Sequence, residues 1–174
     1  MRTLMTLLPL ALACSTQVAH DSGDVTPEDS GDAGTDATTP LEGSYTLFTE
    51  VGTNDCGDQA ALRPEVTGTV SSASDTAYTF LLEQPEENLQ FSCSLSDGAF
   101  SCSAETSEDY ASWGWAAVLN FSHVMTGSWS SADAFEGSLS STTECAGSEC
   151  AGLAEIIEST FPCTVSHTVS GTQD

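Results

Sequence analysis

The alternation of apolar and polar residues after position 42 predicts β-strands. Eight segments combine period-two alternation with β-branched and aromatic residues, and turn residues separate them. These segments are residues 43–51, 65–72, 77–83, 89–96, 99–103, part of 114–127, 134–142 and 163–170. Residues 151–160 instead place Leu153, Ile156 and Ile157 at helical spacing. The pattern therefore predicts an all-β domain with one short helix.

Residues 91–102, FSCSLSDGAFSC, give the most specific local prediction. Asp97 and Gly98 suit the two positive-φ positions of a type I′ turn. A hairpin folded about this turn places Cys93 opposite Cys102 at a non-hydrogen-bonded pair, where side chains approach closely enough for a disulfide. A bridge across so short a loop stabilises the fold by roughly 2–3 kcal/mol on the chain-entropy model.

The short connections between strands favour antiparallel pairing in sequence order. Eight such strands with one apolar face predict an up-and-down barrel, and a β-sandwich is the alternative. The tripeptide Gly43-Ser44-Tyr45 at the start of the first strand resembles the G-x-W motif of lipocalins, with Tyr45 in place of Trp. The resemblance implies a lipocalin-like barrel that carries a small apolar ligand.

Residues 1–13, MRTLMTLLPLALA, have the layout of a secretory signal peptide: one Arg, a short apolar run and small residues at the end. The stretch LALAC that follows resembles the lipobox of bacterial lipoproteins, with Ala11 and Leu12 departing from its usual pattern. The resemblance implies a lipid on Cys14. Because Ser15 rather than Asp follows, it also implies transfer to the outer membrane, on the periplasmic or the surface side.

The number of cysteines favours this lipid anchor over an ordinary signal peptide. Residues 11–13, Ala-Leu-Ala, also satisfy the A-x-A rule and would be cut at the same bond. The chain has seven cysteines, and an exported chain with an odd number has one reactive thiol left over. Assigning Cys14 to a lipid leaves six cysteines for three disulfides.

Residues 14–40 are predicted to form a disordered tether before a folded domain at 41–174. The segment after Cys14 has six acids, no aromatic residue and no apolar periodicity. It resembles the Asp/Ser/Gly/Thr-rich spacers of bacterial lipoproteins, and its span is roughly 30 Å. Weak Ca²⁺ binding by its aspartates is the alternative, but their spacing does not fit an EF-hand loop. The aspartates concerned are Asp21, Asp24, Asp29, Asp32 and Asp36.

The predicted topology also places the remaining four cysteines. If odd-numbered strands run away from the tether, Cys56 and Cys163 meet at the far end of the barrel. Cys145 and Cys150 bracket the short loop CAGSEC at that end. We therefore favour the pairs Cys56–Cys163 and Cys145–Cys150, although four cysteines allow three pairings.

The charge balance excludes one class of partner and suggests another. The chain has 26 Asp and Glu, two Arg and no Lys, for a net charge of −24. Nucleic-acid binding needs basic side chains that replace counterions, so it is excluded. The far end of the predicted barrel collects 11 of the 20 acids in residues 41–174. Such a surface binds Ca²⁺ through loop carboxylates, attracts a basic protein partner or serves as a solvated face.

The densest aromatic group falls in and around the sixth predicted strand. Four of its members share one parity and would face one side: Trp113, Trp115, Phe121 and Trp129. Eight-stranded barrels either fill with side chains or hold one small ligand. These rings are therefore candidates for a ligand pocket, with a plain hydrophobic core as the alternative.

The sequence gives little support for catalysis, a cofactor or a metal centre. It lacks G-x-S-x-G, S-x-x-K and H-E-x-x-H, and the cysteine spacing does not suit zinc. His123 and His167 are possible bases without a diagnostic nucleophile. We predict a non-enzymatic, lipid-anchored protein with an acidic interaction domain. The alternatives are a lipocalin-like carrier of a small apolar ligand and, third, a hydrolase centred on His123 or His167.

Overall fold

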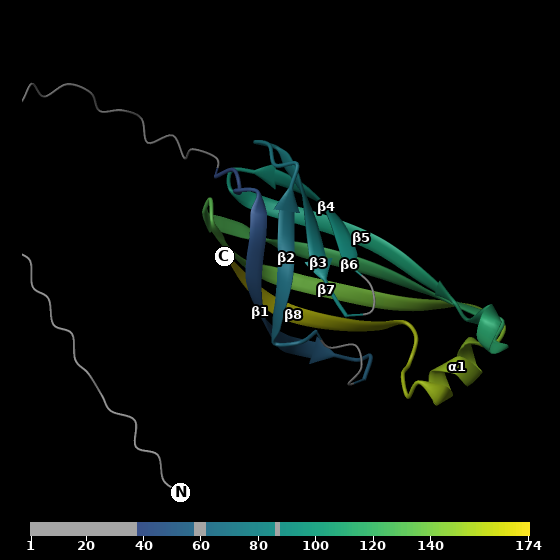
Figure 1. Cartoon of the computed structure of the whole chain (residues 1–174). Helices are drawn as coiled ribbons and strands as arrows, with labels where there is room; N and C mark the ends of the chain where they lie inside the picture. The colour runs from purple at the N-terminus through teal and green to yellow at the C-terminus, as the bar shows by residue number, and fades with distance from the viewer. Residues whose placement is uncertain (1–37, 58–61, 86–87) are drawn as a thin grey trace, which may run out of the picture. The chain divides into compact units, whose positions relative to one another are not determined.

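Eight antiparallel strands close into a barrel in which the order of strands follows the sequence, and β8 pairs with β1 (Figure 1). The computed structural model describes residues 38–57, 62–85 and 88–174. The predicted all-β up-and-down barrel with one short helix is therefore confirmed, and the sandwich alternative is wrong. The signal peptide, Cys14 and most of the predicted tether lie outside the described residues.

The structure gives the following bounds for its elements, in chain order. They are β1 (Gly43–Asn54), β2 (Glu65–Ser71), β3 (Ala77–Glu83), β4 (Leu89–Ser96), β5 (Ala99–Asp109), the 3-10 helix η2 (Tyr110–Trp113), β6 (Ala117–Ser131), β7 (Ala134–Gly147), α1 (Cys150–Ile156) and β8 (Cys163–Gln173). The predicted bounds of β3 and β4 are correct. β1, β5, β6, β7 and β8 continue beyond their predicted ends, and α1 is shorter.

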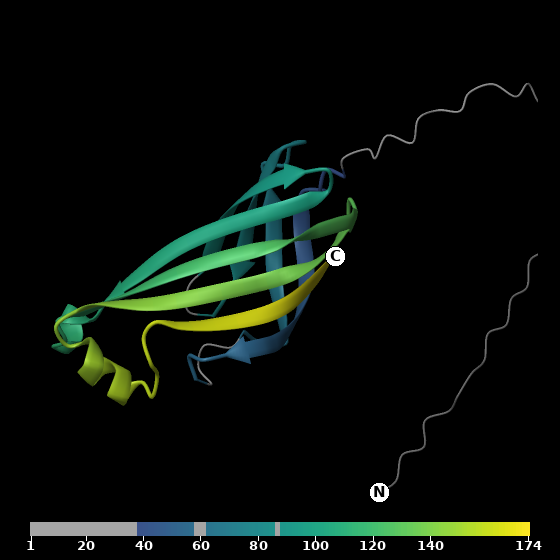
Figure 2. The same cartoon turned by 180° about the vertical axis from the view of Figure 1, so that it is seen from behind.

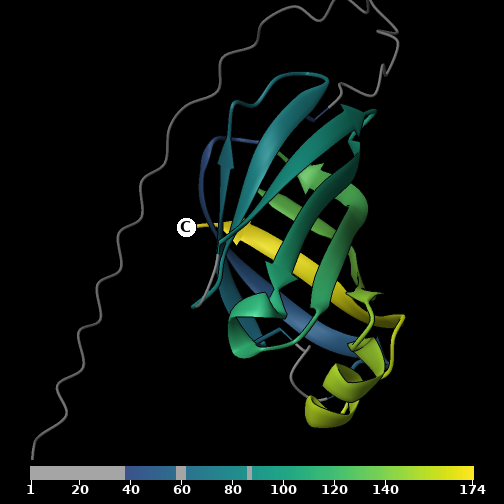
Figure 3. The ribbon, with the colours of Figure 1, turned by 90° about the vertical axis from the view of Figure 1, so that its right-hand side faces the viewer.

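The two sides of the barrel differ in length. β6 has 15 residues and β2 has 7, a difference of about 26 Å at the usual rise of a strand. The long strands β5, β6 and β7 extend past the short side and carry η2 and α1 at their far end (Figures 1 and 2). The barrel therefore has a closed end, where its short turns and the C-terminus lie, and an open end, where one wall continues alone. Figure 3 shows the open end facing the viewer.

Aromatic side chains fill the closed end. Their ring centroids lie 4.8–6.4 Å apart in edge-to-face or tilted pairs, the preferred arrangement for such rings. The rings belong to Tyr45, Tyr78, Phe80, Phe91, Phe100, Trp129 and Phe135. The Tyr45 hydroxyl donates to the Leu41 carbonyl oxygen at 2.8 Å. Burial raises the pKa of Tyr45 to about 12, so this hydroxyl keeps its proton at neutral pH.

Two glycines make room for this aromatic cluster. A Cβ at Gly68 would lie 2.3 Å from a ring carbon of Phe80, and one at Gly171 would lie 2.3 Å from a ring carbon of Phe135. Real side chains do not approach so closely, so the rings occupy the space that a side chain would need. Glycine inside a strand commonly marks such a close approach.

Three disulfides join the pairs that the sequence favoured: Cys56–Cys163, Cys93–Cys102 and Cys145–Cys150. Cys93 lies directly opposite Cys102 in the β4–β5 ladder. The turn residues Asp97 and Gly98 both have positive φ, 50° and 77°, as the type I′ prediction requires. In the part of the chain that the structure describes, no helix is long and apolar enough to cross a membrane.

Candidate binding pocket at the open end of the barrel

A pocket of about 620 Å³ lies at the open end of the barrel. Inward-facing residues of β6 show why it forms there. Trp129 and Met125 are buried in the aromatic cluster, but His123 and Phe121 are only half-buried. His123 still contacts Phe91 near the start of β4, with ring centroids 6.4 Å apart; beyond this level β4 ends and the long wall continues without it. The barrel is therefore filled at its closed end and hollow at its open end.

His123 is held in the wall of this pocket by a neighbour on the next strand. It lies directly opposite Ser141 in the β6–β7 ladder, and a hydrogen bond of 2.8 Å joins His123 Nδ1 and Ser141 Oγ. The ring of Phe121 lies parallel to the imidazole, with centroids 6.4 Å apart. Burial lowers the pKa of His123, so the ring is neutral at pH 7 and offers both a donor and an acceptor.

His167 on β8 lies in the wall of the same pocket and is only 2% exposed. The Leu62 backbone N–H donates to His167 Nε2 at 3.0 Å, which places the ring proton on Nδ1. Among the described residues, no acceptor bonds to this buried Nδ1. Burial lowers the pKa of His167 as well.

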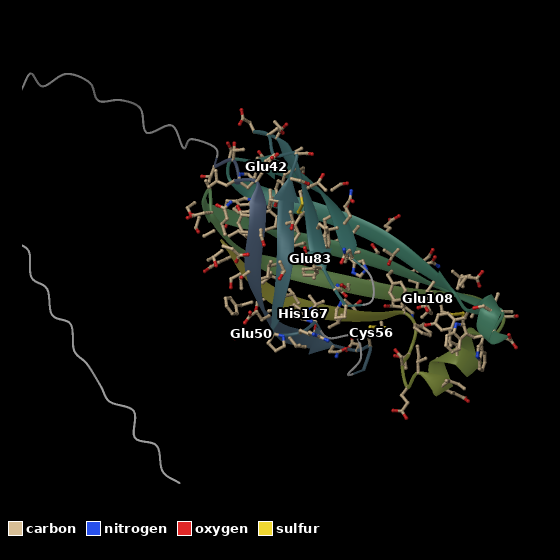
Figure 4. The ribbon with its side chains drawn as sticks, viewed as in Figure 1. Glu42, Glu50, Cys56, Glu83, Glu108 and His167 are labelled. Carbon is tan, nitrogen blue, oxygen red and sulfur yellow. A yellow bond between two sulfur atoms is a disulfide. The ribbon has the colours of Figure 1, made fainter. Side chains whose placement is uncertain are left out.

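A carboxylate stands at the rim of the pocket. Glu108 is exposed, but it has the same parity as the buried Cys102 and Ala104 of β5, so it lies on the inner face of the long wall. The Tyr110 hydroxyl donates to Glu108 Oε2 at 2.9 Å. Burial and the nearby carboxylate raise the pKa of Tyr110, which keeps this donor protonated. Figure 4 shows Glu108 towards the far end of the wall and His167 closer to the barrel body.

The connection from α1 to β8 forms another side of the pocket through Ile157, Ser159 and Phe161. α1 packs Leu153 into a small apolar cluster with residues of η2 and β6. A disulfide lies at each end of this segment: Cys145–Cys150 at its start and Cys56–Cys163 at its end. This side is therefore fixed covalently at its start and at its end.

The structure does not bring together the four residues predicted for an aromatic pocket. Trp113 lies in η2 and is 77% exposed, Trp115 packs against Gly152 of α1, and Trp129 belongs to the aromatic cluster at the closed end. Only Phe121 lines the pocket. The shared parity holds from Ala117 onwards, where β6 begins. It fails for the first two tryptophans because Gly114, with φ of 86°, ends η2 and interrupts the extended chain.

The His123–Ser141 pair supplies two parts of a nucleophilic site. A base within hydrogen-bond distance of a hydroxyl is the first requirement of serine nucleophiles. The third part, a group that orients the base, is not found among the described residues: Ser141 is the one side chain hydrogen-bonded to His123 there. Both residues also lie in a continuous ladder, in which the local backbone N–H groups already take part in strand pairing. The pair suits ligand binding better than acyl transfer.

No protein-family model, curated protein or solved structure matches this chain. The interpretation of the pocket therefore rests on its own residues and geometry. The described ranges also contain no group of three or more His, Cys, Asp or Glu side chains placed to hold a metal ion. The tether aspartates considered for a Ca²⁺ loop lie outside these ranges.

The two histidines predict a pH dependence of stability between pH 7.5 and 5.5. Their pKa values in the folded protein lie below the usual 6.5, so the unfolded chain binds more protons in this window. The free energy of unfolding should then fall as the pH falls through 6.5, by at most about 1.4 kcal/mol per pH unit for each histidine. Asp174, whose pKa is lowered by hydrogen bonds from Thr46 and Ser44, titrates below this window.

Urea unfolding at pH 7.5, 6.5 and 5.5 measures this dependence. The double variant His123→Gln with His167→Gln should show a flatter profile than the parent. An equal slope in both proteins would contradict the assignment of the pH dependence to these rings.

Proposed function

We propose that the barrel is a binding domain for a small molecule and that a lipid on Cys14 anchors it at a bacterial outer membrane. One observation carries the binding part of the proposal, the pocket of about 620 Å³ at the open end, whereas the lipid anchor rests on the sequence around Cys14. This volume falls within the roughly 300–1,000 Å³ of small-molecule sites, which combine apolar walls with a few placed polar groups. Here Phe121, Phe161 and Leu119 supply apolar surface, and His123 and Ser141 supply hydrogen-bonding groups.

The pocket favours a carrier over the other functions that the sequence suggested. The interaction hypothesis rests on surface charge alone. The hydrolase hypothesis gains the His123–Ser141 hydrogen bond but has no orienting acid among the described residues. A carrier needs a concave site with a few polar groups, and the open end of the barrel offers that arrangement.

A solvatochromic dye and one pocket-filling variant test the binding proposal. The neutral dye N-phenyl-1-naphthylamine should bind with a one-to-one stoichiometry and an increase in fluorescence. Ser141→Trp adds a large side chain on the inner face of β7 and should weaken dye binding by at least about tenfold, a loss of about 1.4 kcal/mol. Ser140→Trp adds the same side chain at the neighbouring position, which faces outward, and should bind the dye like the parent.

Two outcomes would contradict the proposal. The first is the absence of dye binding to the parent protein. The second is equal binding by the two tryptophan variants, which would place the dye outside the pocket. Circular dichroism spectra of both variants establish that the barrel is intact.

The lipid anchor has its own test. Cys14→Ser removes the acylated residue but keeps Ala-Leu-Ala at residues 11–13, so signal cleavage at the same bond is retained. We expect the parent in the membrane fraction and the variant in the soluble fraction of exported protein. A variant that remains with the membrane would contradict lipidation at Cys14.

A further inference from the structure

We propose that the pocket selects ligands that carry a positively charged amine on an apolar body and that it rejects anions. This inference rests on the proposed function and adds the chemical class of the ligand. It follows from the charges at the pocket, the free acceptor at its rim, the aromatic side chains that line it and the electrostatic field of the open end.

The charges at the pocket are of one sign. Glu108 is the one carboxylate among the described residues that line it, and none of those residues is a Lys or Arg. Arg63, the single cationic side chain of residues 41–174, is exposed and is not part of the lining. A ligand carboxylate or phosphate would lose its hydration without gaining a counter-charge, which is costly.

The rim carboxylate also has capacity for another hydrogen bond. Tyr110 donates to Glu108 Oε2, and no described residue donates to Oε1. A carboxylate with a free oxygen at the mouth of a pocket accepts a hydrogen bond from an ammonium group, and such charge-assisted bonds are stronger than neutral ones. Glu108 is therefore the group that we expect to hold the amine.

Aromatic and aliphatic side chains line the pocket together with this carboxylate. Tyr110 is its hydrogen-bond partner, and Phe121, Phe161, Leu119 and Ile157 line the same pocket. Aromatic faces attract an ammonium group as well as apolar surface. The geometry thus suits a ligand whose amine lies at the rim and whose apolar part lies deeper, towards His123.

The surroundings of the open end add a long-range preference for cations. Several exposed acids flank the mouth from the end of β5, from α1 and from the connections at this end; they are Asp55, Asp109, Glu149, Glu155 and Glu158. A field of one sign raises the local concentration of ligands of opposite charge. Salt screens this effect over about 10 Å at 0.1 M, so it should weaken as salt is added.

Three probes with one ring system and different head groups separate charge from apolar fit. They are 1-naphthylmethylamine, 1-naphthalenemethanol and 1-naphthoate, titrated calorimetrically into the full-length Cys14→Ser protein at pH 7.5 and low salt. We expect the amine to bind about fivefold more tightly than the alcohol, the scale of one favourable exposed charge pair. The naphthoate should bind more weakly than the alcohol. Added 0.5 M NaCl should reduce the preference for the amine.

A pair of charge-neutral variants locates the preference. Glu108→Gln should reduce amine binding about three- to fivefold and leave the alcohol unchanged. Glu105→Gln removes the same charge from the outer face of the same strand and should leave the preference for the amine nearly intact.

The titrations distinguish a failure of the charge inference from a failure of the binding proposal. If the alcohol binds and the amine is no tighter, or if naphthoate binds best, the inference about charge is wrong and the binding proposal stands. If none of the three probes binds, the pocket proposal is wrong and the charge inference fails with it. If Glu105→Gln and Glu108→Gln have equal effects, the overall field selects the amine, and Glu108 does not hold it.

Discussion

Replacing Cys56 and Cys163 together with alanine should lower the free energy of unfolding by about 4–5 kcal/mol. This disulfide joins residues 107 positions apart, and the loss of unfolded-state entropy on closing a loop grows with its length. It also ties the connection after β1 to the start of β8, where both residues line the pocket. Urea unfolding without reductant measures the change, and the naphthylamine dye should bind the variant more weakly.

The matched control is Cys145→Ala with Cys150→Ala. This bridge closes a separation of 5 residues, so the same model gives a loss of only about 2 kcal/mol. If the two double variants lose the same stability, loop length does not explain the contribution of Cys56–Cys163.

Replacing Phe135 with alanine should cost about 3–5 kcal/mol of stability. Its ring is buried at the centre of the aromatic cluster, with its centroid 4.8 Å from that of Trp129 and 5.6 Å from that of Phe100. Thermal and urea unfolding measure the loss.

Phe48→Ala is the control for this prediction. Phe48 lies on the outer face of β1 and is 52% exposed, so its removal should cost less than about 1 kcal/mol. Similar losses in both variants would contradict the claim that the aromatic cluster at the closed end stabilises the barrel.

The sequence predicted the strands best where the barrel is full. The bounds of β3 and β4 follow from complete alternation, because every inward residue from Tyr78 to Leu82 and from Leu89 to Leu95 contributes to one core. The hairpin disulfide could be predicted from the Asp97-Gly98 turn, because the local geometry of a tight turn sets which residues face each other.

The same reasoning failed where the barrel is hollow. The inward positions Thr106 and Glu108 of β5 and Ser141 and Thr143 of β7 line the pocket, so polar residues occupy both faces of these strands. The alternation that marks a strand disappears there, and the predicted ends fell short. The polar residues that make the open end suitable for a ligand are therefore also the reason why the sequence pattern did not predict the full length of these strands.

The His123–Ser141 pair could not be derived by counting from the β6–β7 turn. A register shift lies between Trp129 and Ser131, so the ladder pairs Ser131 with Ala134 but Trp129 with Phe135. Counting from the turn without this irregularity places His123 opposite Thr142. Sequence reasoning identified both histidines, but the pairing of His123 with Ser141 depends on an irregularity that the residue pattern does not indicate.

A native mass spectrum of the Cys14→Ser protein tests the central claim most directly. The protein is made in an oxidising compartment and mixed with a small-molecule extract of the cells that produce it. The proposal predicts a one-to-one adduct that is lost on denaturation and absent from a second sample that also carries Ser141→Trp. The denatured mass should be six hydrogens below that of the reduced chain, one pair for each disulfide. A bare mass in both samples, or an adduct that Ser141→Trp does not remove, would contradict a ligand site at the open end.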